Sequence, residues 1–141
     1  MQRLVRQLKI ERLPEDERIV PLAAWDGEPA VLLGPADDPA ELAGRLDALQ
    51  VIAVDFPQFT DGRGYSSARL LRERHGYRGE LRAVGEVLPD TVGYLSRCGF
   101  DAFVLAGQAE AENALERFED FSEAYQASVE RPLPLFRRRV E

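Results

Sequence analysis

The chain has 141 residues, of which 45% are hydrophobic and 30% are charged. This composition is typical of one soluble globular domain and excludes a membrane-spanning or disordered chain. The formal net charge of −7 argues against general nucleic-acid binding, because neutralising phosphates needs a basic surface. The single cysteine excludes an internal disulfide and fits a reducing compartment, so we expect a cytoplasmic protein.

The same inventory limits the chemistry of the chain. Cys98 and His75 are each the only residue of their type. One chain therefore holds neither an iron–sulfur cluster bound by four cysteines nor a zinc site of cysteines and histidines. We expect no metal or iron–sulfur cluster. Redox chemistry would need an organic cofactor, whose identity the sequence leaves unknown, or a partner protein.

At the N-terminus, residues 4–10 and 18–22 favour additional strands, separated by the polar segment 11–17. From residue 28 onward, units of a strand followed by a helix repeat. The predicted core strands are the apolar runs 30–33, 51–54, 81–84 and 103–106.

Each of these strands is followed by helix signals. Asp38 and Pro39 predict a helix start, and leucines at helical spacing predict one buried stripe through residue 49. Ser66 predicts the cap of a second helix, which Gly76 ends, and a third runs from Pro89 to Gly99. The last helix carries an apolar stripe with acidic residues mostly on its other face. The leucines of the first stripe are Leu42, Leu46 and Leu49, and the stripe of the last helix is Ala111, Ala114, Leu115, Phe118, Phe121 and Tyr125.

Strands alternating with helices predict an α/β fold whose mostly parallel sheet contains four βα units, as an open sheet or a half-barrel, with variable N-terminal strands. We expect one domain over residues 1–126 and an extended tail over 127–141. Exposed sheet edges favour dimerisation or a covering element, so a homodimer is an open alternative.

The most distinctive block spans residues 51–87, because a loop rich in glycine, aromatic and polar residues lies between its two strands. Ligands of parallel sheets collect at the carboxyl ends of the strands, which places Asp55, loop 57–66, Glu86 and Gln108 along one rim. Asp55 and Asp61 are the candidates for a catalytic base. The candidates for binding an anion or a partner are Gly62, Arg63, Gly64, Tyr65, Ser66, Arg69, Arg82 and Glu86. Further arginines that make this neighbourhood basic are Arg72, Arg74 and Arg78.

A purely structural interpretation of the same residues stays open. Asp61 also fits a turn, the glycines fit its backbone geometry, and Tyr65 fits packing of the helix on the sheet. His75 suits the end of its helix, and Cys98 suits an inert thiol.

Several runs of the sequence resemble a bacterial family known as domain of unknown function 934. The resemblance covers residues 35–139, and the first 30 residues differ from typical members. It implies a link to sulfite reduction, since members are commonly encoded beside the haem-containing sulfite reductase and phosphoadenylylsulfate reductase and carry an oxidoreductase label. It supplies no catalytic residues. The runs are DFPQFTDGRGYSSARLLRERHGYRGELRAVGEVLPD, RCGFDAF, FEDFSEAYQ and PLFRRR.

These observations favour an accessory protein of assimilatory sulfite reduction that docks to sulfite reductase or to a neighbouring enzyme of sulfate assimilation. The lack of metal and disulfide chemistry favours docking over catalysis, although whether the protein is an enzyme stays open. One alternative is an enzyme that binds a small oxyanion or a phosphate-bearing cofactor at residues 61–66. Another is a structural homo-oligomeric module.

Overall fold

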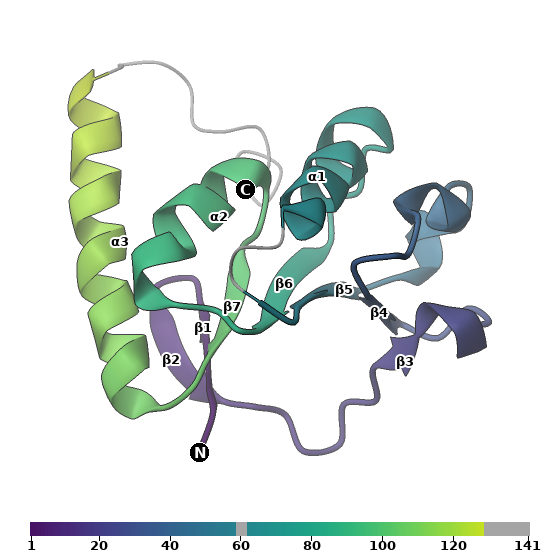
Figure 1. The fold of residues 1–141 in the computed structure, drawn as a ribbon, viewed down its shortest axis with the longest axis horizontal. Helices are drawn as coiled ribbons and strands as arrows, with labels where there is room; N and C mark the ends of the chain where they lie inside the picture. The colour runs from purple at the N-terminus through teal and green to yellow at the C-terminus, as the bar shows by residue number, and fades with distance from the viewer. Residues whose placement is uncertain (59–61, 129–141) are drawn as a thin grey trace.

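A computed structural model of the chain describes residues 1–58 and 62–128, and in the second range it describes side chains as far as Phe118. The strands form one open sheet in the order β2-β1-β7-β6-β5-β4-β3 (Figure 1). Neighbours from β3 to β7 run parallel, whereas β1 pairs antiparallel with both β7 and β2. The predicted α/β class is confirmed, and the sheet is not part of a barrel. The strands are β1 (Arg3–Arg6), β2 (Lys9–Arg12), β3 (Val20–Pro21), β4 (Ala30–Leu33), β5 (Val51–Phe56), β6 (Glu80–Gly85) and β7 (Ala102–Leu105).

The predicted core strands correspond to β4, β5, β6 and β7. β4 has the predicted bounds, and β5 and β6 are longer than predicted because their ladder continues through the pairs Asp55↔Val84 and Phe56↔Gly85. β7 begins one residue earlier than predicted and ends at Leu105. Polar or glycine residues at strand ends thus take part in pairing that the apolar pattern does not reveal.

Three α-helices follow the later strands: α1 (Arg63–Arg69), α2 (Val92–Cys98) and α3 (Gln108–Ser128). α1 continues into a π-helical turn, η4 (Leu70–Arg74), in which the His75 N–H donates to the Leu70 carbonyl. Gly76 and Gly99 have positive φ values of 70° and 121°, as predicted for glycines that end helices. Short 3₁₀ turns are η1 (Leu22–Ala24), η2 (Pro39–Leu42), η3 (Leu46–Ala48) and η5 (Pro89–Thr91).

The helix predicted to begin at Asp38 is wrong, because only the turns η2 and η3 form there. Asp38 does cap the first of them, since its carboxylate accepts a hydrogen bond from the Ala40 N–H at 2.9 Å. Gly44, with φ of 87°, breaks the segment between the two turns. The leucines predicted to form one stripe still pack into the core.

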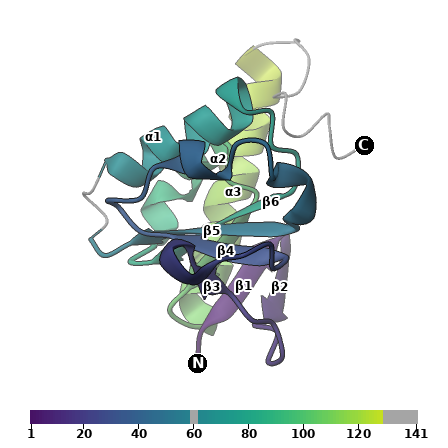
Figure 2. The same ribbon diagram turned by 90° about the vertical axis from the view of Figure 1, so that its right-hand side faces the viewer.

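The helices cover one face of the sheet and build the main core with it. Ile52, Val54 and Phe56 of β5 belong to this core, together with Val92 and Leu95 of α2. Figure 2 shows α1 and α2 on the same side of β4 and β5. The main core therefore lies between this face of the sheet and the helices.

The opposite face carries a smaller cluster of Leu4, Ala102 and Val104, against which Leu13 and Val84 pack. The connector from residue 13 to 19 leads from β2 to β3 along this side (Figure 1). Part of the segment predicted to be a polar spacer, residues 11–17, thus belongs to strand β2 and to a covering connector. The connector thus covers part of the face that lacks helices.

Candidate functional site

The carboxyl ends of β5 and β6 form the rim where a site was predicted. Asp55 is half-buried there, next to Gly85, whose φ is 90°. A Cβ at Gly85 would lie 2.5 Å from Oδ1 of Asp55, so glycine leaves room for the carboxylate. Because side chains alternate along a strand and Phe56 lies under the helices, Asp55 faces the opposite side of the sheet. The structure therefore separates Asp55 from α1 by the sheet itself.

The beginning of α1 places the predicted glycines in different surroundings. α1 begins at Arg63, three residues before Ser66, and Gly62 is its N-cap without a side-chain hydrogen bond. Gly64 is buried against Phe56, because a Cβ there would lie 2.5 Å from the ring. Gly64 thus sets the close packing of α1 on β5, whereas Gly62 has open space around it. Asp61 lies outside the described residues.

A group of tyrosine and arginine side chains lies between α1 and α2, and we call it the aromatic–arginine patch: Tyr65, Arg69 and Tyr94. The rings of Tyr65 and Tyr94 have centroids 5.0 Å apart. Tyr65 also packs on the buried Phe56 at 5.2 Å, so the patch is anchored in the core. Tyr94 is 48% exposed, which is high for an aromatic side chain.

Electrostatics keep the patch positive. The Cys98 thiol and, less strongly, the Tyr94 hydroxyl contact Arg69 and raise the pKa of its guanidinium. Burial, with a smaller contribution from Cys98, raises the pKa of Tyr65 and keeps its phenol neutral. Cys98 is itself only 2% exposed, which agrees with the structural interpretation of this thiol. The patch therefore offers neutral aromatic groups beside one permanent positive charge.

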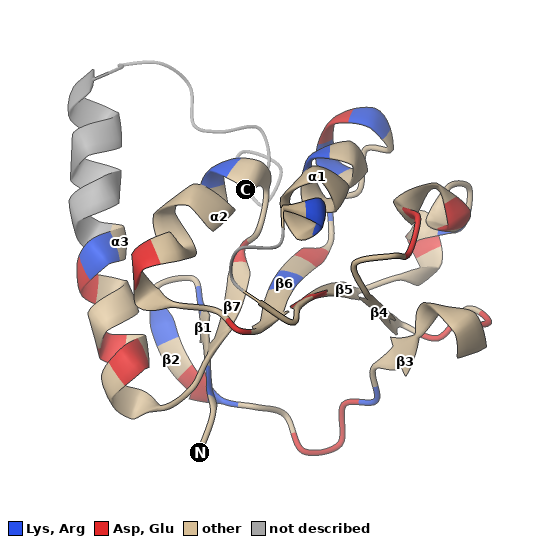
Figure 3. Cartoon of the chain, viewed as in Figure 1, with Lys and Arg blue, Asp and Glu red and all other residues tan. Residues whose placement is uncertain are grey.

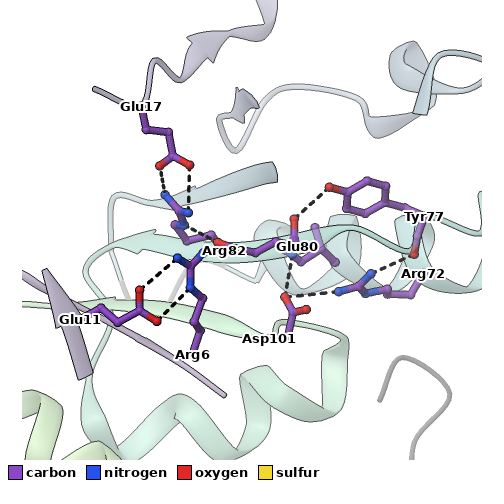
Figure 4. Close-up of polar contacts among 9 residues, drawn as sticks. Arg6, Glu11, Glu17, Arg72, Tyr77, Glu80, Arg82 and Asp101 are labelled. Carbon is purple, nitrogen blue, oxygen red and sulfur yellow. Dashed lines mark hydrogen bonds and ion pairs between the residues drawn. The ribbon is translucent and has the colours of Figure 1, made fainter. Parts of the chain in front are cut away.

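Arg72, on the same helical segment, is buried and has a different role. Its guanidinium donates to the carbonyls of Gly99, Tyr77 and Gly79 at 2.8–2.9 Å. It also lies 3.5 Å from Oδ1 of Asp101, which accepts a hydrogen bond from the Leu81 N–H (Figure 4). These contacts hold the end of the helix to the amino end of β6, so Arg72 is a structural residue.

Arg82 is 1% exposed and lies in a second network on the face opposite the helices. Its guanidinium donates to Glu17 at 2.5 Å and to Glu80 at 2.6 Å (Figure 4). Burial lowers the pKa of Arg82, but the bonds to Glu17 and Glu80 outweigh burial and the net shift is upward. Glu80 also accepts from Arg6, which contacts Glu11 as well. Arg82 thus joins β6 to the N-terminal segment.

The remaining predicted arginines lie near the other end of the helix. Arg74 and Arg78 are exposed. Arg78 and His75 line a pocket of about 400 Å³, which Asp47 and two leucines also line. The arginines predicted to form one basic region therefore lie in separate places. Arg69 is in the patch, Arg72 and Arg82 are in two buried networks, and Arg74 and Arg78 are at the far end of the helical segment. Figure 3 shows basic segments on α1 and α2 and acidic segments on the connector before β3 and at the start of α3.

The hydrogen bonds described for Glu86 and Gln108 are to residues outside the patch. The Glu86 N–H donates to the Phe56 carbonyl at 2.7 Å, and its side chain is exposed. Gln108 begins α3 and accepts a hydrogen bond from Arg3 at 3.1 Å. Arg63 and Ser66 are exposed on α1. Among the predicted binding residues, Tyr65 and Arg69 lie close together, because both interact with Tyr94 and Cys98.

The described ranges contain neither a candidate metal site nor a helix that could span a membrane. No group of three or more His, Cys, Asp or Glu side chains there is arranged to hold a metal ion. Within the same ranges, no helix is both long enough and apolar enough to cross a membrane.

Tyr94 is the residue of the patch that the sequence interpretation did not single out. Val92 and Leu95 of α2 belong to the core, and a tyrosine between them falls on the outer side of the helix. A large aromatic residue at an outward position is a usable signal of a contact surface. The sequence does not show that Tyr65 and Arg69 of α1 lie beside it, because this contact depends on how α1 and α2 pack together.

The structure is a small open-sheet α/β protein with an aromatic and positively charged patch on its surface. Residues 30–136 match the family described as bacterial proteins of unknown function, DUF934. The chain therefore belongs to this family. No curated protein and no solved structure matches the chain. The matched range begins at β4 and so leaves out β1, β2, β3 and the connector.

Proposed function

We propose that the protein is an accessory protein of assimilatory sulfite reduction that docks to the sulfite reductase machinery through the aromatic–arginine patch. The observation that carries docking is Tyr94, which is 48% exposed although it contacts Tyr65 and Arg69. Tyrosine and arginine dominate the binding energy of many protein interfaces. The link to sulfite reduction comes from the family resemblance of the sequence.

The chemistry of the patch suggests what the partner surface offers. Arg69 keeps its charge, so the partner surface would contain a carboxylate, and the tyrosine rings would fill an apolar depression beside it. Charge pairs of this kind weaken with salt when they are exposed. We expect the complex to be tightest at low ionic strength.

Binding to purified sulfite reductase tests the docking surface. Replacing both Arg69 and Tyr94 by alanine should raise the Kd at least about thirtyfold, since truncating even one hot-spot residue costs about 2 kcal/mol. Arg78→Ala is the matched control, because Arg78 is also exposed but lies outside the patch. Equal affinities of all three proteins would contradict docking through the patch.

Growth of a deletion strain tests the pathway. Cells that lack an accessory of sulfite reduction should need a reduced sulfur source, with sulfide restoring growth and sulfite failing. Complementation with the Arg69 and Tyr94 double variant should fail as well, whereas the Arg78→Ala protein should complement. Normal growth of the deletion strain on sulfate would contradict any role in sulfur assimilation.

The enzyme alternative gives a different result in the same strain. An enzyme that acts on an oxyanion before sulfite would be bypassed by added sulfite. Asp55→Asn would then be as severe as the deletion, although Asp55 faces away from α1. A folded Asp55→Asn protein that complements fully would favour docking.

A further inference from the structure

The two outer edges of the sheet are built differently. At one edge, β3 has two residues, the second of which is Pro21, and proline has no N–H for pairing. At the other edge, β2 has four residues and no proline. The β3 edge is therefore blocked against further strands, whereas the β2 edge has the length to accept one.

The turn before β2 determines which of its main-chain groups face outward. Gln7 and Leu8 have φ values of 54° and 60°, as in a two-residue hairpin turn closed by the hydrogen-bonded pair Arg6↔Lys9. Hydrogen-bonded pairs alternate along an antiparallel ladder, so Glu11 also bonds toward β1. The N–H and C=O groups of Ile10 and Arg12 then point away from the sheet. In the described ranges no strand lies beyond β2.

We propose that this edge pairs antiparallel with β2 of a second copy of the chain, about a twofold axis at Ile10. This register places Ile10 opposite Ile10 and exchanges two main-chain hydrogen bonds between the copies. It also places Lys9 of each copy opposite Glu11 of the other. Opposite charges facing each other across strands stabilise pairing.

The side-chain directions fit this register. Ile10 packs against the main core, so the two copies extend the apolar side under the helices. Lys9 and Glu11 project from the opposite face, where Glu11 is 38% exposed although it contacts Arg6. Shifting the register by one residue would place Ile10 opposite Glu11 of the other copy, whose main-chain groups bond toward β1, so the hydrogen bonds between the copies would be lost. Shifting it by two residues would place Glu11 opposite Glu11 or Lys9 opposite Lys9, and like charges opposite each other disfavour both registers. The sequence therefore favours the twofold at Ile10.

The pairing also covers the tip of the hairpin. Leu8 is 50% exposed, and its φ of 60° is unfavourable for a residue other than glycine. In the proposed register, Leu8 lies opposite Arg12 of the second copy, whose aliphatic stem can cover it. Charged residues at a sheet edge usually discourage pairing with other chains. Here Lys9 and Glu11 form opposite-charge pairs only with a strand of suitable sequence, and β2 of a second copy is such a strand.

Sedimentation velocity over rising protein concentration tests the proposal. The wild-type protein should pass from monomer to dimer, and Lys9→Glu should raise the dimer Kd at least about fivefold, because it replaces an attractive pair with a repulsive one on both sides of the axis. Arg18→Glu is the matched control, since it makes the same change in net charge outside β2 and should dimerise like wild type. A wild-type protein that stays monomeric at all concentrations would overturn the proposal.

Ile10→Pro removes an outward N–H and leaves the hairpin bonds to β1 in place, so it should abolish dimerisation of a folded monomer. Amide exchange of the wild-type protein provides a second measurement that needs no variant. The amides of Ile10 and Arg12 should be protected only at concentrations where the dimer forms, whereas the Glu11 amide should be protected at every concentration. Exchange of Ile10 that is equally fast in monomer and dimer would place the interface elsewhere and refute this pairing.

Discussion

Arg72 and Arg69 lie on the same helical segment, three residues apart, yet their surroundings are opposite. Arg72 is buried, and three carbonyls and Asp101 surround its guanidinium. Arg69 lies on the exposed surface between α1 and α2, beside Tyr94 and Cys98. The local arrangement of acceptors, not the local density of arginines, decides whether a basic side chain supports the fold or is available to a partner.

The largest change in stability is expected from Arg72→Ala, and the surface residue Arg69 provides the comparison. The substitution leaves the carbonyls of Gly99, Tyr77 and Gly79 without their donor in a buried place. We expect the free energy of unfolding to fall by about 3–5 kcal/mol. Urea unfolding measures this change. Arg69→Ala should stay within about 0.5 kcal/mol of wild type, and a similar loss in both variants would break the comparison.

A smaller effect is expected from Gly64→Ala, which affects the patch through packing. The new Cβ would lie 2.5 Å from the ring of Phe56, which is 2% exposed and has little room to move. Moving α1 away should lower the free energy of unfolding by about 1–3 kcal/mol and weaken partner binding. Gly62→Ala is the control, because no atom lies within 4 Å of its Cβ and its φ is −78°. It should leave stability unchanged or raise it by up to about 1 kcal/mol, and equal losses would refute the packing role of Gly64.

The smallest effect concerns pH. Burial raises the pKa of Asp101, although the Arg72 guanidinium opposes the shift. An acid with a raised pKa is protonated more readily in the folded state, so the stability that it contributes is complete below its ordinary pKa of 3.8 and falls as pH rises through the folded value. Asp101→Asn should remove this decline and keep the oxygen that accepts from the Leu81 N–H. The measurement is the free energy of unfolding of the wild-type protein and of Asp101→Asn as the pH rises from below 3.8. A difference between the two proteins that stays constant with pH would contradict the expectation.

Much of the fold is readable from local signals in the sequence. The apolar runs locate β4 to β7, and Gly76 and Gly99 end their helices because their φ values are positive. The segment after Asp38 was predicted as a helix because its leucine spacing is helical. The positive φ at Gly44 and the short length of the segment outweigh that spacing.

The candidate site was less predictable, because it depends on contacts between distant segments. Tyr65 and Arg69 were predicted to bind a partner, but their neighbour Tyr94 comes from another helix. Arg82 was grouped with them, and only the folded chain shows that Glu17, from a connector 65 positions away, pairs with it. Asp55 shares the predicted rim but faces the opposite side of the sheet, a consequence of strand alternation that places it apart from α1.

The pairing of Glu17 with Arg82 also has a consequence for how this family can diverge. Arg82 lies inside the range 30–136 that matches the family, whereas Glu17 lies outside it. A lineage that replaced its N-terminal segment would leave the buried guanidinium with Glu80 as its remaining carboxylate partner, and a buried charge that loses a partner is costly. We expect residues 17 and 82 to be inherited together: relatives with an arginine at the position of Arg82 should supply an acid from whatever segment precedes β4, and relatives without such an acid should have an uncharged residue there. An alignment of family members in which the two positions vary independently would contradict this expectation.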